Sequence, residues 1–310
     1  MFSNIPYNEI ISSKLNSEIK NINFQNYYYN YLKTDFILDT KFLFPISIRT
    51  NQTSTDLFSH FYYKKYKHFF LKEYYEFVKN NLDKLQSFSE SFVVGSHNNY
   101  YHLVIDILPR IFGYNKITNK YVKNIIFTES KLEKSKIIKS LFETKKIEKE
   151  VIILKKGTYI FNNSLFTLRQ NLQNVIKNYR DTFAESLHNL PKKNIYISRA
   201  DAKQRKILNE VELINNLKKL NFEIINLSDL NFIEQMTLFN SSKCIVALHG
   251  AGLTNLIFCN EKTSVIEIFP DFSNSNNDWY SLGKQNNQIL NMIRPHYLKI
   301  SQINNLDHTL

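Results

Sequence analysis

In the second half of the chain, short apolar runs alternate with segments whose apolar residues recur every three or four positions. Short apolar runs are typical of buried parallel strands, and the wider spacing is typical of amphipathic helices. The predicted strands lie at residues 194–198, 223–226, 244–248 and 264–269. The predicted helices lie at residues 208–220, 231–239 and 253–258, the last with one apolar side. This alternation predicts an α/β domain with a Rossmann-like parallel sheet.

The first half of the chain shows a looser alternation of the same kind. One or two strands are predicted within residues 35–48, and further strands at 92–95, 122–127, 151–154 and 164–168. Helices are predicted at residues 57–85, 100–112 and 131–142. A helix-like run over residues 175–190, ended by Pro191, is the predicted bridge between two domains.

The predicted elements divide the chain into two domains. An N-terminal acceptor-side α/β domain is expected over residues 1–175, a linker helix over 176–191 and a C-terminal nucleotide-sugar-binding domain over 192–285. Residues 286–310 form a tail, with a return to the first domain as one option. A length of 310 residues suffices for two modest cores, and 43% hydrophobic with 22% charged residues is typical of a folded protein.

The formal net charge of +12 at pH 7 indicates either an anionic partner or a lysine-rich solvated surface. Phosphate groups, nucleic acid or an anionic membrane would each satisfy the first alternative. No lysine–arginine block stands alone as a nucleic-acid arm, and no RNA-recognition or zinc-finger pattern occurs. No nucleic-acid partner is therefore predicted.

Cysteine usage and hydropathy bear on the compartment. Cys244 and Cys259 lie in the last predicted strand–helix–strand unit and are expected to be core thiols. No window approaches about twenty uncharged apolar residues, the length that a spanning helix needs. The N-terminal segment lacks a basic region followed by an apolar core. The expected location is the cytoplasm, with peripheral contact at the inner face of the cytoplasmic membrane left open.

A turn of small residues follows the strand predicted at 244–248. It consists of His249, Gly250, Ala251 and Gly252, and it opens the next predicted helix. Backbone N–H groups and partial positive charge at a helix N-terminus favour phosphate, so this turn predicts a nucleotide site. His249 would donate to a phosphate or stabilise a leaving diphosphate, unless it only holds the loop through backbone hydrogen bonds.

Two polar residues beyond the turn have open roles. Asn255 either belongs to the nucleotide site or caps and packs the helix. Glu267 lies inside an apolar strand, where a buried carboxylate needs a partner. A ribose hydroxyl or a pairing with Arg205 would each satisfy Glu267.

Two arginines form a candidate diphosphate clamp. Arg199 and Arg205 follow the strand predicted at 194–198, and the carboxyl ends of strands are where open α/β sheets bind ligands. Guanidinium groups bind phosphate oxygens through paired hydrogen bonds. On its own the pattern favours a solvated basic loop, and the nearby turn at 249–252 shifts the interpretation to the clamp.

A histidine–aspartate pair lies on the helix predicted at 100–112. His102 and Asp106 are four residues apart and therefore share one face of that helix. Pro109 is expected to bend or end the helix. Such a pair is either structural or part of a general-base site.

Three stretches resemble the signature of glycosyltransferase family 61. They are HGAGLTNLIF followed by VIEIFP, the stretch SRADAKQRKILNE, and YYHLVIDILPRIF. The resemblance implies a GT-B-like α/β fold, in which two Rossmann-like domains face a central cleft. It adds Asn209 and Glu210 to the donor-binding residues, and it places the catalytic base in the first domain, as either Asp106 or His102.

The resemblance also implies the reaction. Family members are inverting transferases that use nucleotide sugars, and a UDP-linked donor is expected. The implied acceptor is a glycan or lipid-linked glycan of a capsule or another envelope polysaccharide. Neither an Asp-x-Asp motif nor a Cys/His cluster with metal spacing occurs, so catalysis without a metal or other cofactor is expected.

Two other classes remain as alternatives. A Rossmann-type enzyme that uses NAD or a methyl donor would fit the glycines after a strand, but a G-x-G-x-x-G pattern requires glycine at position 255, which is Asn255. A non-catalytic nucleotide- or nucleic-acid-binding protein would fit the net charge alone.

Overall fold

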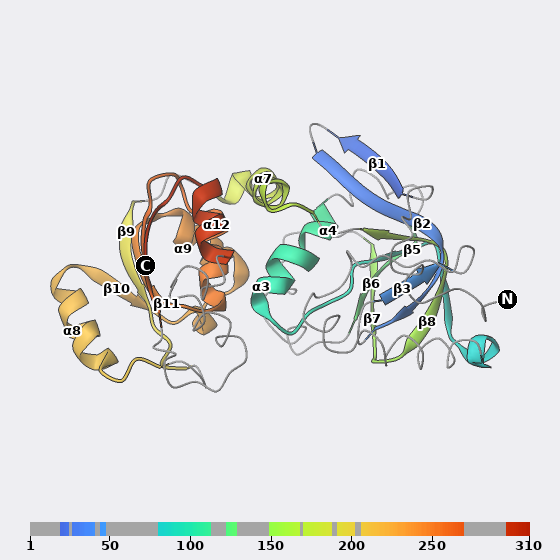
Figure 1. The fold of residues 1–310 in the computed structure, drawn as a ribbon, viewed down its shortest axis with the longest axis horizontal. Helices are drawn as coiled ribbons and strands as arrows, with labels where there is room; N and C mark the ends of the chain where they lie inside the picture. Colours follow the sequence, from blue (N-terminus) through green and yellow to red (C-terminus); the bar gives the residue numbers. More distant parts are fainter. Residues whose placement is uncertain are drawn as a thin grey trace, which may run out of the picture. The chain divides into compact units, whose positions relative to one another are not determined.

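Two β-sheets form the framework of the computed structural model (Figure 1). The structure describes residues 19–24, 27–40, 44–47, 80–112, 122–128, 149–167, 170–187, 191–201, 206–269 and 296–310. The chain divides into two compact units, Met1–Asn178 and Tyr179–Leu310, with one sheet in each. The prediction of an α/β protein is therefore confirmed, although only the second sheet is entirely parallel.

The sheet of the first unit is mixed. Its eight strands are β1 (Ile19–Phe24), β2 (Tyr27–Asp39), β3 (Phe44–Ser47), β4 (Ser87–Ser89), β5 (Ser91–Val93), β6 (Asn124–Thr128), β7 (Glu150–Leu154) and β8 (Thr158–Thr167). The order is β1-β2-β8-β5-β6-β7, with β3 paired to β2 and β4 to β8. Strands β8, β5, β6 and β7 run parallel, whereas β1, β2 and β3 extend the sheet through antiparallel pairs.

The segment predicted as one helix over residues 100–112 forms three consecutive pieces. These are α3 (Tyr100–His102), a π-helical turn η3 (Leu103–Ile107) and α4 (Pro109–Phe112). The helix resumes at Pro109 and does not end there, because proline needs no N–H at the first position of a helix. Leu103, Val104, Ile105 and Ile107 of the π-helical turn are buried. π-Helical turns are frequent at functional sites, where they re-aim side chains.

Two predicted helices of the first half lie largely or wholly outside the described residues. Residues 57–79 and 131–142 belong to this group. Of the helix predicted at 57–85, the described part contains the helical residues 80 and 81 and a short 3₁₀ turn, η2 (Leu82–Lys84).

The sheet of the second unit is entirely parallel. Its strands are β9 (Lys193–Ile197), β10 (Phe222–Ile225), β11 (Ser242–Leu248), β12 (Ser264–Ile268) and β13 (Asp307–Thr309), in the order β10-β9-β11-β12-β13. Strand β10 therefore lies at the edge of the sheet beside β9, and β11 lies on the other side of β9. This doubly wound order has its switch point between β9 and β11. The Rossmann-like prediction for this half is confirmed at the level of a parallel α/β sheet.

Helices cover both faces of the parallel sheet. Figure 1 shows α8 (Glu210–Lys219) on one side, and α9 (Phe232–Asn240) and α12 (His296–Ile303) on the other. Leu217 of α8 packs with Tyr196 and Val246 in one core cluster. The segment predicted as a helix with one apolar side is a 3₁₀ helix, η7 (Ala251–Phe258), and its last six residues are buried all round.

The boundary between the units falls inside α7 (Leu172–Thr182). Before the boundary, Asn178 Nδ2 donates to Gln170 Oε1 at 2.7 Å. After it, Tyr179 packs against Phe232 and Phe258. The predicted linker helix is thus shorter than the run from 175 to 190: it ends at Thr182, and a 3₁₀ turn, η5 (Ala184–Ser186), follows.

The described part of the C-terminal tail lies in the second unit. Strand β13 pairs in parallel with β12, opposite Ser264, Val265 and Ile266. The option that the tail returns to the first domain therefore does not describe residues 307–309, which complete the second sheet. Residues 270–295, including the helix predicted near 281–286, lie outside the described residues. Within the part of the chain that the structure describes, no helix is long and apolar enough to cross a membrane.

Candidate active site

The carboxyl ends of β9 and β11 flank the switch point of the parallel sheet. Arg199 follows β9 after Ser198, and His249 follows β11 directly. At a switch point the connections leave in opposite directions, which opens a crevice for a ligand. The two adjacent strands thus bring Arg199 and the turn at 249–252 to one place, as predicted.

The Arg199 guanidinium lies directly against Gly250. A Cβ atom added at Gly250 would stand 2.1 Å from Arg199 Nη1 and 3.1 Å from its Cζ. The backbone of Gly250 is extended, with φ 173°, so glycine is needed here for the contact and not for its conformational freedom. The guanidinium can occupy this position only because Gly250 has no side chain.

Gly252 serves packing. A Cβ atom there would stand 2.7 Å from Leu227 Cδ1 and 4.0 Å from Ile197 Cγ2. Its small size lets η7 lie close to Leu227 of the 3₁₀ turn η6 (Leu227–Asp229). Contact of the backbone at Gly252 with a phosphate stays a prediction. Ala251, between the two glycines, is half-buried.

Glu210 holds the end of β9. Its Oε1 accepts hydrogen bonds from Tyr196 Oη at 2.7 Å, Ser198 Oγ at 2.9 Å and the backbone N–H of Arg199 at 3.3 Å. Burial raises the pKa of the Tyr196 phenol, and the hydrogen bond to Glu210 raises it further, so the phenol stays a donor. Glu210 fixes the strand end from which Arg199 departs, which differs from the predicted contact with nucleotide.

Asn209, which follows the basic loop, does not join this arrangement. Asn209 is exposed, and its Nδ2 donates to Glu212 Oε2 at 3.4 Å. Arg205 lies outside the described residues, so its predicted role as the second arginine of the clamp stays a prediction.

Asn255 takes the packing role. It is fully buried, and its Nδ2 donates to Gln235 Oε1 at 3.0 Å. Gln235 Nε2 in turn donates to the carbonyls of Leu227 and Leu230. Asn255 therefore joins η7 to α9 and to the loop before it, and it occupies the position where a dinucleotide-binding pattern would have glycine.

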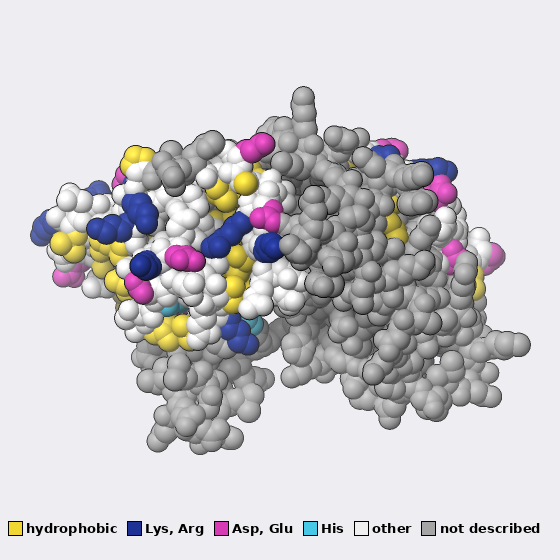
Figure 2. Space-filling view, turned by 90° about the horizontal axis from the view of Figure 1, so that it is seen from above, with side chains coloured by type: hydrophobic (Ala, Val, Ile, Leu, Met, Phe, Trp, Pro, Cys, Tyr) yellow, Lys and Arg dark blue, Asp and Glu magenta, His cyan; other side chains and the backbone are white. Residues whose placement is uncertain are grey.

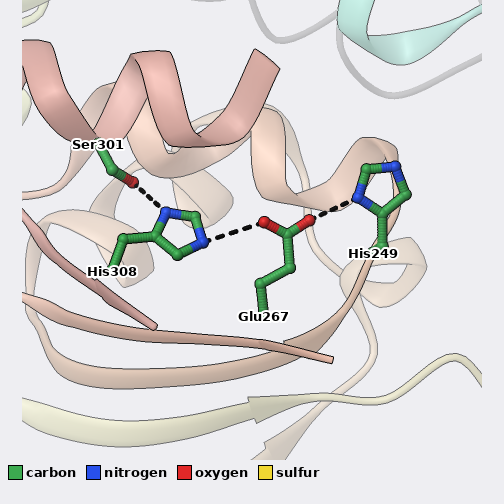
Figure 3. Close-up of polar contacts among 4 residues, drawn as sticks. All are labelled: His249, Glu267, Ser301 and His308. Atoms are coloured by element: carbon green, nitrogen blue, oxygen red, sulfur yellow. Dashed lines mark hydrogen bonds and ion pairs between the residues drawn. The ribbon is translucent and has the colours of Figure 1, made fainter. Parts of the chain in front are cut away.

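A line of polar side chains runs beneath the turn (Figure 3). His249 Nδ1 is 2.5 Å from Glu267 Oε1, and His308 Nε2 is 3.0 Å from Glu267 Oε2. Ser301 Oγ is 2.7 Å from His308 Nδ1. The side chains of Glu267 and His308 are each only 2% exposed, whereas that of His249 is 16% exposed. His249 is the member of this line nearest to solvent.

The partners of Glu267 keep it ionised. Burial raises the pKa of its carboxyl, but hydrogen bonds from His249 and His308, together with their charges, lower it by more, so the net shift is downward. With both oxygens engaged and the carboxylate buried, a ribose hydroxyl could reach it only by displacing a histidine. This placement argues against the ribose contact predicted from the sequence.

The predicted pair in the first unit forms a contact. His102 Nδ1 is 2.7 Å from Asp106 Oδ2, and their side chains are 28% and 14% exposed. The shared face predicted from the spacing is confirmed, although the residues between them form a π-helical turn. Because Asp106 accepts the Nδ1 hydrogen, the lone pair of a neutral His102 lies on Nε2, where a general base needs it.

A second histidine, His97, lies beside this pair. Its ring centroid is 4.5 Å from that of His102, and its Nδ1 accepts the backbone N–H of Asn99 at 2.9 Å. Burial and the charge of His102 lower the pKa of His97 to about 4, against an opposing effect of Asp106. His97 is therefore neutral near pH 7, with its hydrogen on Nε2.

The sequence-based site omitted three residues that the structure adds. His97 could have been noticed, because it stands five residues before His102 in the same histidine- and asparagine-rich stretch. His308 and Ser301 carry no local signal, since they follow Glu267 by more than thirty residues. Among the described side chains, no group of three or more His, Cys, Asp and Glu residues could hold a metal ion.

The surface charge is mixed. Among the described residues on the face drawn in Figure 2, Lys and Arg side chains are interspersed with acidic and apolar ones. Lys193 and Glu223 form an exposed ion pair at 2.9 Å. For the described residues, this mixture fits a solvated surface better than a track for nucleic acid.

Comparison with known proteins agrees with this geometry. The family model named Glycosyltransferase 61 matches residues 100–266, more than half of the chain. Over 70 residues the chain is 36% identical to the EGF domain-specific O-linked N-acetylglucosamine transferases of Bos taurus and Rattus norvegicus, and 37% identical to that of Gallus gallus. Each of these alignments covers 21% of this chain and only 13% of the relative.

The matched region contains His102 and Asp106 of the first unit and Arg199 and His249 of the second, and it ends one residue before Glu267. The chain belongs to glycosyltransferase family 61.

Proposed function

We propose that this chain is an inverting glycosyltransferase that moves a sugar from a UDP-linked donor to a hydroxyl of a glycan acceptor. Family membership and the names of the relatives support sugar transfer as the reaction class. The observation that carries the proposal is the Arg199 guanidinium held against Gly250, beside His249, at the switch point of a parallel sheet. Open α/β sheets bind their ligands at this place.

On the donor side, the protein would stabilise the leaving diphosphate. The bond between the anomeric carbon and the diphosphate oxygen breaks, and its electron pair goes to the diphosphate. Arg199 offers hydrogen bonds from a fixed cation, and His249 offers its Nε2 edge next to it. Preorganised donors aimed at developing charge often lower the barrier of an enzymatic reaction more than any other single effect.

On the acceptor side, the first unit would supply the base. His102 Nε2 takes the proton of the acceptor hydroxyl, while Asp106 holds the ring by its Nδ1 hydrogen. The acceptor oxygen then bonds to the anomeric carbon on the face opposite the diphosphate, which inverts the configuration. Asp106 acting directly as the base is the second version of the same proposal.

Several finer assignments accompany the proposal. The two units would face a cleft in a GT-B arrangement, with the donor on the second unit. The reaction would need no metal or other cofactor, because Arg199 and His249 supply the charge that a metal would otherwise provide. The acceptor would be a glycan or lipid-linked glycan in envelope polysaccharide synthesis, reached in the cytoplasm or at the inner membrane face. The names of the relatives make N-acetylglucosamine the first sugar to test.

The first test removes the guanidinium. We expect Arg199→Ala to weaken UDP binding by about 1.5–3 kcal/mol, roughly 10- to 150-fold, the range for hydrogen bonds to charged groups. Isothermal titration calorimetry with UDP measures this change. Lys193→Ala is the matched control, because it removes one positive charge from the opposite end of the same strand.

The control should bind UDP as the wild type does. Equal affinity in Arg199→Ala and the wild type would place the nucleotide elsewhere. Absence of binding by the wild type to any nucleoside diphosphate would overturn the proposed function itself.

A further inference from the structure

Helix α12 and strand β13 carry two side chains, Ser301 and His308, that are connected to the Glu267 carboxylate beneath the turn at 249–252. His308 lies on β13, the edge strand, directly opposite Val265 of β12. Ser301 lies on α12, and its Oγ is 2.7 Å from His308 Nδ1. His308 approaches Glu267 from the side opposite His249, and Ser301 lies behind His308 (Figure 3). They are therefore remote from the turn but connected to it through one carboxylate.

The hydrogen bonds of this line fix where its protons lie. An ionised carboxylate only accepts hydrogen bonds, so each nitrogen that contacts Glu267 must carry a hydrogen. These nitrogens are Nδ1 of His249 and Nε2 of His308. A neutral His308 then accepts at Nδ1 from the hydroxyl of Ser301. Ser301 therefore donates to His308, and both His308 and His249 donate to Glu267.

The same arrangement orients the ring of His249. With Nδ1 directed at Glu267, Nε2 lies on the opposite edge of the ring (Figure 3). The ring stacks on Phe269 at 4.8 Å and meets Tyr297 of α12 edge-on at 5.2 Å. Helix α12 thus contacts His249 directly and also supports its carboxylate partner.

We propose that His308 and Ser301 are positioning residues that hold Glu267 in place to orient His249 and to stabilise its positive charge. The inference rests on the proposed function, in which His249 Nε2–H donates to the leaving diphosphate. Residues behind a ligand often set its tautomer and orientation, and their loss typically costs about 10- to 100-fold in the comparable case of metal sites.

Loss of His308 has a predictable effect on the pH profile. The titratable groups described in contact with Glu267 are His249, from the turn after β11, and His308, from β13. Tyr297 and Ser301 of α12 are the neighbouring hydroxyl-bearing residues. Without His308, burial would still raise the pKa of Glu267, and only His249 would oppose it. Glu267 would then take up its proton, and release His249, at a higher pH.

The experiment uses the full chain with four substitutions. Hydrolysis of UDP-N-acetylglucosamine is followed as a function of pH for the wild type, His308→Leu, His308→Gln, Ser301→Ala and Glu267→Gln. We expect His308→Leu to lower turnover at least about 10-fold and to move the acid limb of the pH profile to higher pH. His308→Gln keeps an N–H donor near the Nε2 position. It should therefore retain most of the wild-type turnover and most of the wild-type pH profile. Ser301→Ala should change turnover and the acid limb in the same direction as His308→Leu, but by less.

Glu267→Gln keeps the shape of the side chain but removes its charge, so the acid limb should disappear from its profile. If His308→Leu and Glu267→Gln lower turnover but leave the acid limb where the wild type has it, the proposal is overturned. In that case α12 and β13 only support the fold. If His308→Leu does not fold, the profiles of Ser301→Ala and Glu267→Gln decide in the same way.

A measurement without substrate separates this inference from the proposed function. Long-range ¹⁵N–¹H NMR of the histidines reads which ring nitrogen of His249 carries hydrogen. We expect hydrogen on Nδ1 of the wild-type ring in both its neutral and its charged form, and a mixture of tautomers of the neutral ring in His308→Leu. This result together with absent donor hydrolysis would overturn the transferase proposal and keep the positioning role. A wild-type His249 without hydrogen on Nδ1 would overturn the positioning role whatever the activity.

Discussion

Gly250 and Gly252 stand two residues apart in the same turn, yet different neighbours require each to be glycine. At Gly250 the nearest atom to an added Cβ is a guanidinium nitrogen, the far end of a flexible side chain. At Gly252 it is a terminal methyl group of Leu227, a half-buried residue of the 3₁₀ turn η6. A side chain at position 250 therefore displaces a charge, whereas one at position 252 disturbs the packing between η7 and η6.

This difference gives a prediction about nucleotide binding. Gly250→Ala should push Arg199 aside and weaken UDP binding by about 1–2 kcal/mol, part of what loss of the charged hydrogen bonds costs. Its folding stability should change little, because arginine can move toward solvent. Gly252→Ala should instead destabilise the protein by about 1–3 kcal/mol through overpacking. Calorimetry with UDP and urea unfolding of both variants test the contrast.

In the double variant Gly250→Ala/Arg199→Ala the effects on UDP binding should not add, because the alanine at 250 acts through Arg199. Additive losses in this cycle would show that Gly250 contributes to the site independently of the guanidinium.

Glu267 shows how far a single residue can be predicted from the sequence. A carboxylate inside an apolar strand implies burial and a polar partner, and both are present. Its partner His308 could not be predicted, because it reaches Glu267 only when β13 joins the sheet, 41 residues further along the chain. His249 was predicted at the site, but its contact with Glu267 depends on the register of two neighbouring strands.

At the scale of elements, the turn between β5 and α3 combines several local requirements. Gly95 adopts φ 83°, in the left-handed region that favours glycine, and turns the chain after β5. Asn99 then caps α3 by accepting the N–H of His102 at 3.4 Å. His97 closes the turn by accepting the N–H of Asn99, which only its neutral form can do.

This turn should weaken in acid. The folded pKa of His97, about 4, lies below its ordinary value of 6.5, so the folded state favours the neutral ring. The stabilisation is complete above pH 6.5 and is lost as the pH falls toward 4, because the unfolded chain binds the proton first. The full effect is at most about 3 kcal/mol, and screening at this half-buried site reduces it. Urea unfolding between these pH values measures it.

His97→Asn is the matched variant. Asparagine can accept the same N–H near the Nδ1 position and does not titrate, so its stability should fall less between pH 6.5 and pH 4. Equal slopes of stability against pH for the wild type and His97→Asn would contradict the assignment.

Elements with strong periodic patterns were predicted well, and short or irregular ones were not. Strands β9 to β12 and helices α8 and α9 were expected within about two residues of their ends, the usual uncertainty of element boundaries. β13 has three residues, all of them polar, so no apolar run marks it. The π-helical form of η3 and the 3₁₀ form of η7 depend on tertiary packing, which overrides local propensity.

At the scale of the whole molecule, each unit has its own sheet, its own core and one part of the candidate site. Arg199 and His249 belong to the second unit, and His102 and Asp106 belong to the first. The division of labour proposed for a GT-B enzyme, with donor binding in one unit and the base in the other, therefore maps onto separate units. Substitutions in the two units should have separable effects.

The last prediction tests this separation. His102→Ala and Asp106→Asn should leave UDP affinity nearly unchanged, because the donor is held by the second unit. Sugar transfer to an acceptor should fall by about 10²–10⁴-fold in the variant that loses the base, the usual range for general acid–base catalysis. The larger loss identifies the base, and the smaller loss identifies the residue that orients it across the 2.7 Å contact. Transfer near the wild-type rate in both variants would make the pair structural. Parallel loss of UDP affinity would mean that the donor also depends on the first unit.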